Sequence, residues 1–301
     1  MIRLITAVLI LLVFAGGIVT LTKNSKIKAS EKKAADQALE IPRLYPYPVK
    51  NDNFLQPPPL SAQSVVVLDA KTGIVLFEKD PKVKHFPAST TKLMTALVAL
   101  EKCSPQNHVE VGPIVKEGTQ MGLEKGDVVT VESLLSGMLI ASGNDAAYTL
   151  AFACSDSYLA FIDSMNRKAK ELGMTSTNFE NPAGFDSKDQ YSTAQDLAKL
   201  AKVAVANPLI SRIVSTKSAV LNNVTGTKTY YVENVNDLLG EVEGIEGIKT
   251  GQTSGSGEIL ISKTTRRGNT IIIALLSSNG RFEETKKLIE WAYANFRWIN
   301  P

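Results

Sequence analysis

The sequence contains few side chains of the kinds that bind metals or act as imidazole bases. Its 301 residues include two histidines, His85 and His108, and two cysteines, Cys103 and Cys154. These are too few to form a His/Cys zinc site, and we expect neither a metal nor another cofactor. A Ser-His-Asp triad is short of candidates for the same reason. A metal centre and a histidine-based triad are therefore poor hypotheses for any chemistry here.

The sequence also lacks a large excess of charge of either sign. It has 33 Lys and Arg against 30 Asp and Glu, a formal net charge of +3. Residues 1–33 hold six of the basic residues and one acidic residue, so the rest of the chain is slightly acidic. A nucleic-acid-binding protein presents a basic face, so we expect no nucleic-acid partner. The 44% of hydrophobic residues fits a globular protein with one large domain or two small ones.

One long hydrophobic run lies near the amino terminus. Residues 4–22 carry no charge, and a helix of this length would reach ~28 Å, about the thickness of bilayer hydrocarbon. Arg3 precedes the run and no convincing small-x-small cleavage site follows it, so residues 1–22 are predicted to be an uncleaved signal anchor rather than a removed signal. Five lysines follow within residues 23–33, and charge counting alone would therefore place the amino terminus outside and the rest of the chain in the cytoplasm. The topology therefore has to be decided by the function.

The two cysteines have two possible states. If the rest of the chain lies outside the cytoplasm, Cys103 and Cys154 can pair, because that compartment permits disulfides. The alternative is two buried free thiols, since free cysteine is among the most buried residue types. A disulfide requires a short Cα separation that sequence does not provide, so both interpretations stand.

The remaining chain divides into a linker and a folded part. Residues 23–56 are polar and then proline-rich without apolar periodicity, which predicts a stalk. We expect the folded domain at 57–297 and a short tail at 298–301.

Hydrophobic periodicity within the domain indicates strands, then a block of helices, then strands again. The predicted strands are 64–69, 74–78, 245–250, 257–264 and 270–277. The predicted helices are 89–102, 131–140, 144–154, 157–172, 193–206 and 283–295. Because strands and helices do not alternate as βαβ units, we predict an α+β fold with an antiparallel sheet packed with helices, plus an all-helical subdomain.

Three short motifs point to chemistry when they occur together. They are Ser-x-x-Lys, Ser-x-Asn and Lys-Thr-Gly, a set typical of penicillin-binding proteins and class A β-lactamases. Each is common by itself: the sequence holds three copies of the first, four of the second and two of the third. Context must therefore choose among the copies.

The Ser-x-x-Lys copy at Ser89 and Lys92 opens an apolar helix, whereas the other two lie in the polar stalk. A spacing of three places both side chains on one helix face, where the amine can take the hydroxyl proton. A solvated lysine is already protonated, so this role requires burial or a nearby cation that lowers its pKa.

The other two motifs are chosen in the same way. Ser142 and Asn144 lie between two predicted helices, in a loop from which both can point into a cleft. The copy of Lys-Thr-Gly at Lys249 ends a β-rich run, while the one at Lys71 is explained by a hairpin turn. A strand edge at Lys249 could pair with a bound peptide.

With these motifs in this order, residues 57–297 resemble the serine D-alanyl-D-alanine carboxypeptidases, the low-molecular-mass penicillin-binding proteins. The resemblance extends to residues 118–123, 140–147, 181–185 and 191–194. It implies a β-lactamase/transpeptidase-like fold.

The resemblance also implies catalytic roles. Ser89 would be the acyl-accepting nucleophile and Lys92 its general base. Ser142 would pass a proton to the leaving amine, and Asn144 would donate to the substrate amide and to Lys92.

Substrate-binding roles are implied for a second group of residues. Lys249 and Thr250, with Gly251 next to them, would hold the terminal carboxylate. The backbone N–H of Gln252 would form the oxyanion hole together with that of the nucleophile, although relatives often have His at that position. Arg281 matches an arginine that helps bind the carboxylate; the alternative is a solvated residue that caps the last helix. Ala183 and Gln190 also depart from common family patterns, and we interpret both as tolerated variation.

The function implied is removal of the terminal D-Ala from peptidoglycan stem peptides through an acyl-enzyme on Ser89, with β-lactams as covalent inhibitors. The same machinery could serve a DD-endopeptidase acting on peptidoglycan cross-links. A β-lactamase would need a deacylation base, for which Glu180 is a weak candidate, and a wall-binding relative without activity is the non-enzymatic alternative. The substrate places the domain on the extracytoplasmic face of the membrane, held by its N-terminal segment, or in the medium if the signal is cleaved.

Overall fold

The computed structural model describes residues 45–301. The predicted membrane segment and most of the predicted stalk therefore lie outside the described residues. Across residues 45–301, none of the helices combines the length and apolar character needed to cross a membrane.

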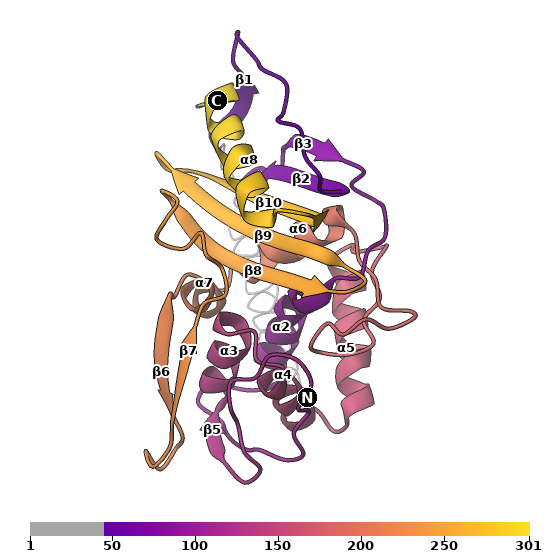
Figure 1. The fold of residues 1–301 in the computed structure, drawn as a ribbon, viewed down its shortest axis with the longest axis vertical. Helices are drawn as coiled ribbons and strands as arrows, with labels where there is room; N and C mark the ends of the chain where they lie inside the picture. The colour runs from indigo at the N-terminus through magenta and orange to yellow at the C-terminus, as the bar shows by residue number, and fades with distance from the viewer. Residues whose placement is uncertain (1–44) are drawn as a thin grey trace, which may run out of the picture. The chain divides into compact units, whose positions relative to one another are not determined.

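The centre of the fold is a five-stranded antiparallel sheet in which strands from both ends of the domain lie side by side (Figure 1). In spatial order its strands are β3 (Val75–Lys79), β2 (Ser64–Asp69), β10 (Asn269–Ser278), β9 (Gly257–Arg266) and β8 (Ile245–Thr253). All five lie at or close to their predicted positions. Strand β8 is at one edge of this sheet, so its outer side is free of a neighbouring strand of the sheet.

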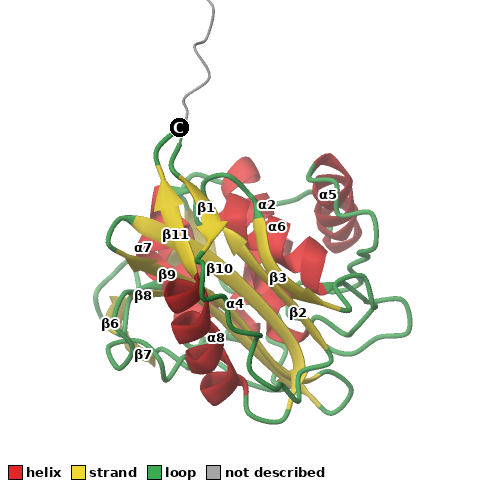
Figure 2. Cartoon of the chain, turned by 90° about the horizontal axis from the view of Figure 1, so that it is seen from above, coloured by secondary structure: helices red, strands yellow, loops and turns green. Residues whose placement is uncertain are grey.

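Strands β2 and β10 are buried on both faces because their side chains alternate between two hydrophobic cores. In β2, Val65 and Val67 belong to one core and Val66 and Leu68 to the other. Helix α8 (Arg281–Asn295) covers the first core, and the helical block covers the second (Figure 2). The sheet is therefore the middle layer, as the α+β prediction requires.

The helical block is confirmed, with one addition. Its helices are α2 (Lys92–Lys102), α3 (Val131–Ile140), α4 (Asn144–Ala153), α5 (Tyr158–Glu171), α6 (Ala194–Ala204) and α7 (Pro208–Val214). Hydroxyl side chains that accept a backbone N–H bond cap three of them, at Thr130, Ser157 and Thr193. Helix α7 was not predicted; Pro208 is its first residue and Asn207 its N-cap.

The structure moves both predicted ends of the domain. Strand β1 (Tyr47–Lys50) pairs with β11 (Phe296–Ile299), so the folded part includes residues assigned to the stalk and to the tail. The proline-rich composition led to the assignment of this strand to the stalk. Pro48 is nevertheless compatible with β1, because proline is tolerated in edge strands. Two further strand pairs were also not predicted: β4 (His108–Glu110) with β5 (Val128–Thr130), and β6 (Ser218–Asn222) with β7 (Thr229–Glu233).

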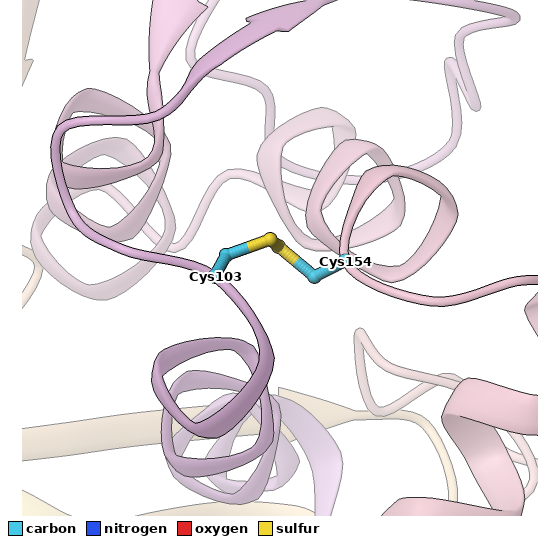
Figure 3. Close-up of a disulfide and its surroundings, with 2 residues drawn as sticks. All are labelled: Cys103 and Cys154. Carbon is cyan, nitrogen blue, oxygen red and sulfur yellow. A yellow bond between two sulfur atoms is a disulfide. The ribbon is translucent and has the colours of Figure 1, made fainter.

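The two cysteines form a disulfide (Figure 3). Cys103 follows the last residue of α2 and Cys154 follows the last residue of α4, and their Cα atoms are 5.6 Å apart. This separation lies within the range that a disulfide requires. The bond ties together the ends of the two helices that begin with Lys92 and Asn144, and it decides between the two states left open above.

We predict that replacing both cysteines with serine lowers the free energy of unfolding by about 2–5 kcal/mol, because the disulfide closes a long loop in the unfolded chain. Guanidinium unfolding of the two proteins measures the difference. A reductant should destabilise the wild type and leave the double variant unchanged. Equal stability of both proteins under oxidising conditions would contradict the assigned bond.

Candidate active site

The Ser89–Lys92 pair lies where a 3₁₀ turn, η1 (Ala88–Thr91), leads into helix α2. The Nζ atom of Lys92 lies 2.9 Å from the Oγ atom of Ser89, as the spacing of three predicted. The same Nζ donates a hydrogen bond of 2.8 Å to the backbone carbonyl of Ala183. The Lys92 side chain is fully buried, whereas Ser89 remains partly accessible. A substrate can therefore reach the hydroxyl while the amine stays away from water.

Burial lowers the pKa of Lys92 well below its ordinary value, because the charged form is poorly solvated there. The cation of Lys249 lowers the pKa further, and the carboxylate of Asp145 raises it. The condition that the motif imposes on its base is thus met by burial first and by a neighbouring cation second. A neutral amine in contact with a hydroxyl can act as its general base.

A second pair of side chains faces the first. Lys249, on β8, donates hydrogen bonds of 3.0 Å to the Oγ atom of Ser142 and 3.1 Å to the carbonyl of Thr250. Its side chain is buried, and this burial together with the cation of Arg281 lowers its pKa to about 7. Ser142 has a φ of 62°, a left-handed conformation that is rare for residues other than glycine. Two separate motifs therefore meet at one hydroxyl.

Asn144 is the first residue of α4 and follows this strained turn. The resemblance implied a hydrogen bond from Asn144 to Lys92. In the structure, the Nδ2 atom of Asn144 donates instead to the carbonyl of Glu117 at 2.9 Å. Among the described residues, the hydrogen bonds of the Lys92 amine go to Ser89 and Ala183. The Asn144 side chain is thus held by the loop that contains Glu117.

Strand β8 brings the remaining predicted residues next to Ser89. A Cβ atom added to Gly251 would lie 3.0 Å from the Cβ of Ala88 and 3.3 Å from the backbone N of Ser89. The close approach of β8 to the turn therefore favours glycine at this position. Gln252, the next residue, is exposed.

Arg281 lies at the start of α8 and reaches across to the same strand. Its Nη1 donates to the carbonyl of Gly251 at 3.1 Å and to Oε1 of Gln252 at 3.4 Å. Arg281 is the first residue of α8, after its N-cap Gly280, and its partly buried side chain bonds to β8, so it is not the solvated cap of the alternative interpretation.

Sequence reasoning missed the contacts that support the Ser89 turn and the loop beside it. Gly184 has a φ of 95°, and a Cβ atom there would lie 1.8 Å from the carbonyl oxygen of Ala88. Gln190 accepts hydrogen bonds from the backbone N–H groups of Glu180 and Asn181 and donates to the carbonyl of Phe185. These contacts hold the loop that supplies the carbonyl bonded to Lys92. The Asn-Pro-x-Gly pattern was the available signal for this loop.

Within residues 45–301, no group of three or more His, Cys, Asp and Glu side chains is placed to hold a metal ion. The side chains gathered at the site offer two hydroxyls, of Ser89 and Ser142, and two amines, of Lys92 and Lys249.

Comparison with known proteins agrees with this geometry. The profile of the D-alanyl-D-alanine carboxypeptidases matches residues 51–280. The chain belongs to this family. D-alanyl-D-alanine carboxypeptidase DacF of Bacillus subtilis is 33% identical over 246 residues, which cover 78% of this chain and 63% of that protein. DacB2 of Mycobacterium tuberculosis is 34% identical over 250 residues, which cover 80% of this chain and 84% of that protein.

Solved structures agree on the fold. The crystal structure of the Streptomyces K15 DD-transpeptidase superposes with a TM-score of 0.76 at 31% identity, covering 80% of this chain and all of that one. The β-lactamase/transpeptidase-like fold is therefore confirmed. The chain spans 63–66% of the length of DacF, of the DacD proteins of Salmonella typhimurium and Escherichia coli, and of DacA of Haemophilus influenzae.

The two lowered pKa values predict how acylation of Ser89 by a fluorescent penicillin depends on pH. The rate should rise as pH increases through the pKa of Lys92, because the base must be neutral. It should fall as pH passes about 7, where Lys249 loses its positive charge. In Lys249→Arg the alkaline limb should disappear, since arginine keeps its proton. A wild-type rate that does not fall above about pH 7 would contradict the role given to Lys249.

Proposed function

We propose that the protein is a serine-type D-Ala-D-Ala carboxypeptidase that removes the terminal D-Ala of peptidoglycan stem peptides. The observation that carries this proposal is the 2.9 Å contact between the Ser89 hydroxyl and the fully buried Lys92 amine. Membership of the family supports the substrate class, because its named members are D-alanyl-D-alanine carboxypeptidases. Penicillin-type β-lactams are the expected covalent inhibitors.

Acylation begins when neutral Lys92 takes the hydroxyl proton of Ser89. The Oγ atom then bonds to the carbonyl carbon of the penultimate D-Ala, and the backbone N–H groups of Ser89 and Gln252 stabilise the oxyanion. The proton held by Lys92 reaches the leaving nitrogen through Ser142, the C–N bond breaks, and D-Ala departs. Water then attacks the ester, with Lys92 as its base, and Ser89 is regenerated.

Two cations, Lys249 and Arg281, would bind the terminal carboxylate of the substrate. Lys249 and Thr250 are neighbours on β8, and Arg281 contacts the same strand through the carbonyl of Gly251. A bound carboxylate would favour the protonated form of Lys249. The free edge of β8 is suited to antiparallel pairing with the peptide backbone, which would orient the scissile bond toward Ser89.

The location proposed is the extracytoplasmic face of the membrane, with residues 1–22 as the anchor. The disulfide between Cys103 and Cys154 supports this, because such bonds persist in oxidising compartments. The lysine count after the hydrophobic run argues for the opposite orientation, and the position of the substrate outweighs it. Glu180 does not support a β-lactamase, since its carboxylate binds Ser187 and the backbone N–H of Asp189 within its own loop.

The test is release of free D-alanine from a diacyl-Lys-D-Ala-D-Ala peptide by the detergent-solubilised full chain. Ser89→Ala should abolish both release and acylation by penicillin. Lys92→Ala should slow acylation by at least ~10², the lower end of what general-base catalysis contributes. Ser30→Ala is the matched control, because Ser30 begins another Ser-x-x-Lys copy and should behave as wild type.

Other outcomes would revise the proposal in defined ways. Acylation by penicillin without release of D-alanine would indicate that the substrate is cross-linked peptidoglycan and that the protein is an endopeptidase. Neither acylation nor release from a folded protein would favour a wall-binding relative. Near-wild-type acylation in Lys92→Ala would contradict the role given to this base.

A further inference from the structure

Asp145 follows Asn144 directly, and the catalytic scheme above gives it no role. Its side chain is 1% exposed. Its two carboxylate oxygens accept backbone N–H bonds from Met121 at 2.9 and 3.1 Å, from Gly122 at 2.9 Å and from Leu123 at 3.0 Å. It also accepts the N–H of Ala146 at 2.9 Å, at the start of α4. A buried carboxylate with this many donors fixes a loop firmly, because losing it would leave several buried N–H groups without a partner.

The loop that Asp145 fixes also holds Asn144. The backbone N of Asn144 donates to the carbonyl of Thr119 at 2.7 Å, and its Nδ2 donates to the carbonyl of Glu117 at 2.9 Å. Gly118 has a φ of 71°, and a Cβ atom there would lie 2.5 Å from Nδ2 of Asn144. Asn144 therefore takes its orientation from residues 117–123, and these residues are fixed by Asp145.

Asp145 also carries the negative charge that acts on the base. Among the charged groups acting on Lys92, the cation of Lys249 on β8 lowers its pKa and the Asp145 carboxylate on α4 raises it. Arg281 at the start of α8 acts on Lys249 in turn. One carboxylate thus opposes the cations around the reacting hydroxyl.

We propose that Asp145 is a positioning residue that orients Asn144 through the 117–123 loop and sets the electrostatic balance at the Ser89–Lys92 pair. This inference rests on the proposed function, because it assumes that Ser89 is acylated. It makes two separable claims, one about the loop and one about the charge.

The test is the second-order rate of acylation by fluorescent penicillin, measured against pH in the full chain. Asp145→Asn keeps the size of the side chain but loses the charge and one acceptor oxygen. We expect the rate to fall about 10²-fold, the effect of a misplacement of about 1 Å at a reacting group. The acid limb should also move to lower pH, because the pKa of Lys92 falls further once the carboxylate is neutral. A purely structural role would lower the rate without moving the limb.

Gly118→Ala separates the two claims. It displaces Asn144 without changing any charge, so we expect a comparable loss of rate and an unshifted acid limb. Glu124→Gln is the matched control for charge: it removes an exposed carboxylate just beyond the loop, which pairs with Lys228, and should leave rate and limb as in wild type.

Each outcome decides the inference. Circular dichroism first establishes that the variants fold. If Asp145→Asn does not fold, Asp145→Glu replaces it, and we expect a lower acylation rate with the acid limb unmoved. A wild-type rate in the folded Asp145 variant would overturn the loop claim, and an unmoved limb in Asp145→Asn would overturn the charge claim. Failure of the wild type itself to be acylated would instead overturn the proposed function.

Discussion

The burial of one lysine amine is the constraint on which the rest of this structure depends. A solvated lysine is protonated at neutral pH and does not act as a base, so the proposed chemistry requires Lys92 to lie away from water. Its burial is tolerated because Nζ has two oxygen partners, the Ser89 hydroxyl and the Ala183 carbonyl. Helix α2, the loop of Ala183 and strand β8 therefore enclose the amine while leaving the Ser89 hydroxyl accessible.

Enclosing the amine brings together segments that are far apart in the sequence, and the local backbone conformations reflect it. Ala88, next to Ser89, and Ser142 both have left-handed conformations, with φ of 47° and 62°. Gly184 and Gly251 permit backbone approaches to η1 that a side chain would obstruct. Such positions cost free energy locally and occur where function requires them. The two cores and the disulfide supply the stability that holds them in place.

Much of this could be predicted because each strong pattern has a local cause. Runs of β-branched and other apolar residues identified the central strands, and context chose Ser89 and Lys92 among the three Ser-x-x-Lys copies. The β1–β11 pair could not be predicted, since it joins the two ends of the domain and neither strand has a clear pattern by itself. The role of Asp145 depends on backbone N–H groups more than twenty residues away, which leave no mark in composition. The expected bond from Asn144 to Lys92 was replaced for the same reason, because Glu117 offers a carbonyl that the sequence does not reveal.

The most direct test of the central claim is the pKa of Lys92 itself. Protein labelled with ¹³C at the lysine Cε can be titrated by NMR, and the signal that disappears in Lys92→Ala identifies the residue. The account predicts that this signal titrates well below the ordinary value of 10.5, so that a substantial fraction of the amine is neutral where the enzyme works. Titration of Lys92 near 10.5 in the folded protein would contradict the account, because the base would then be protonated and Ser89 would have no partner able to take its proton.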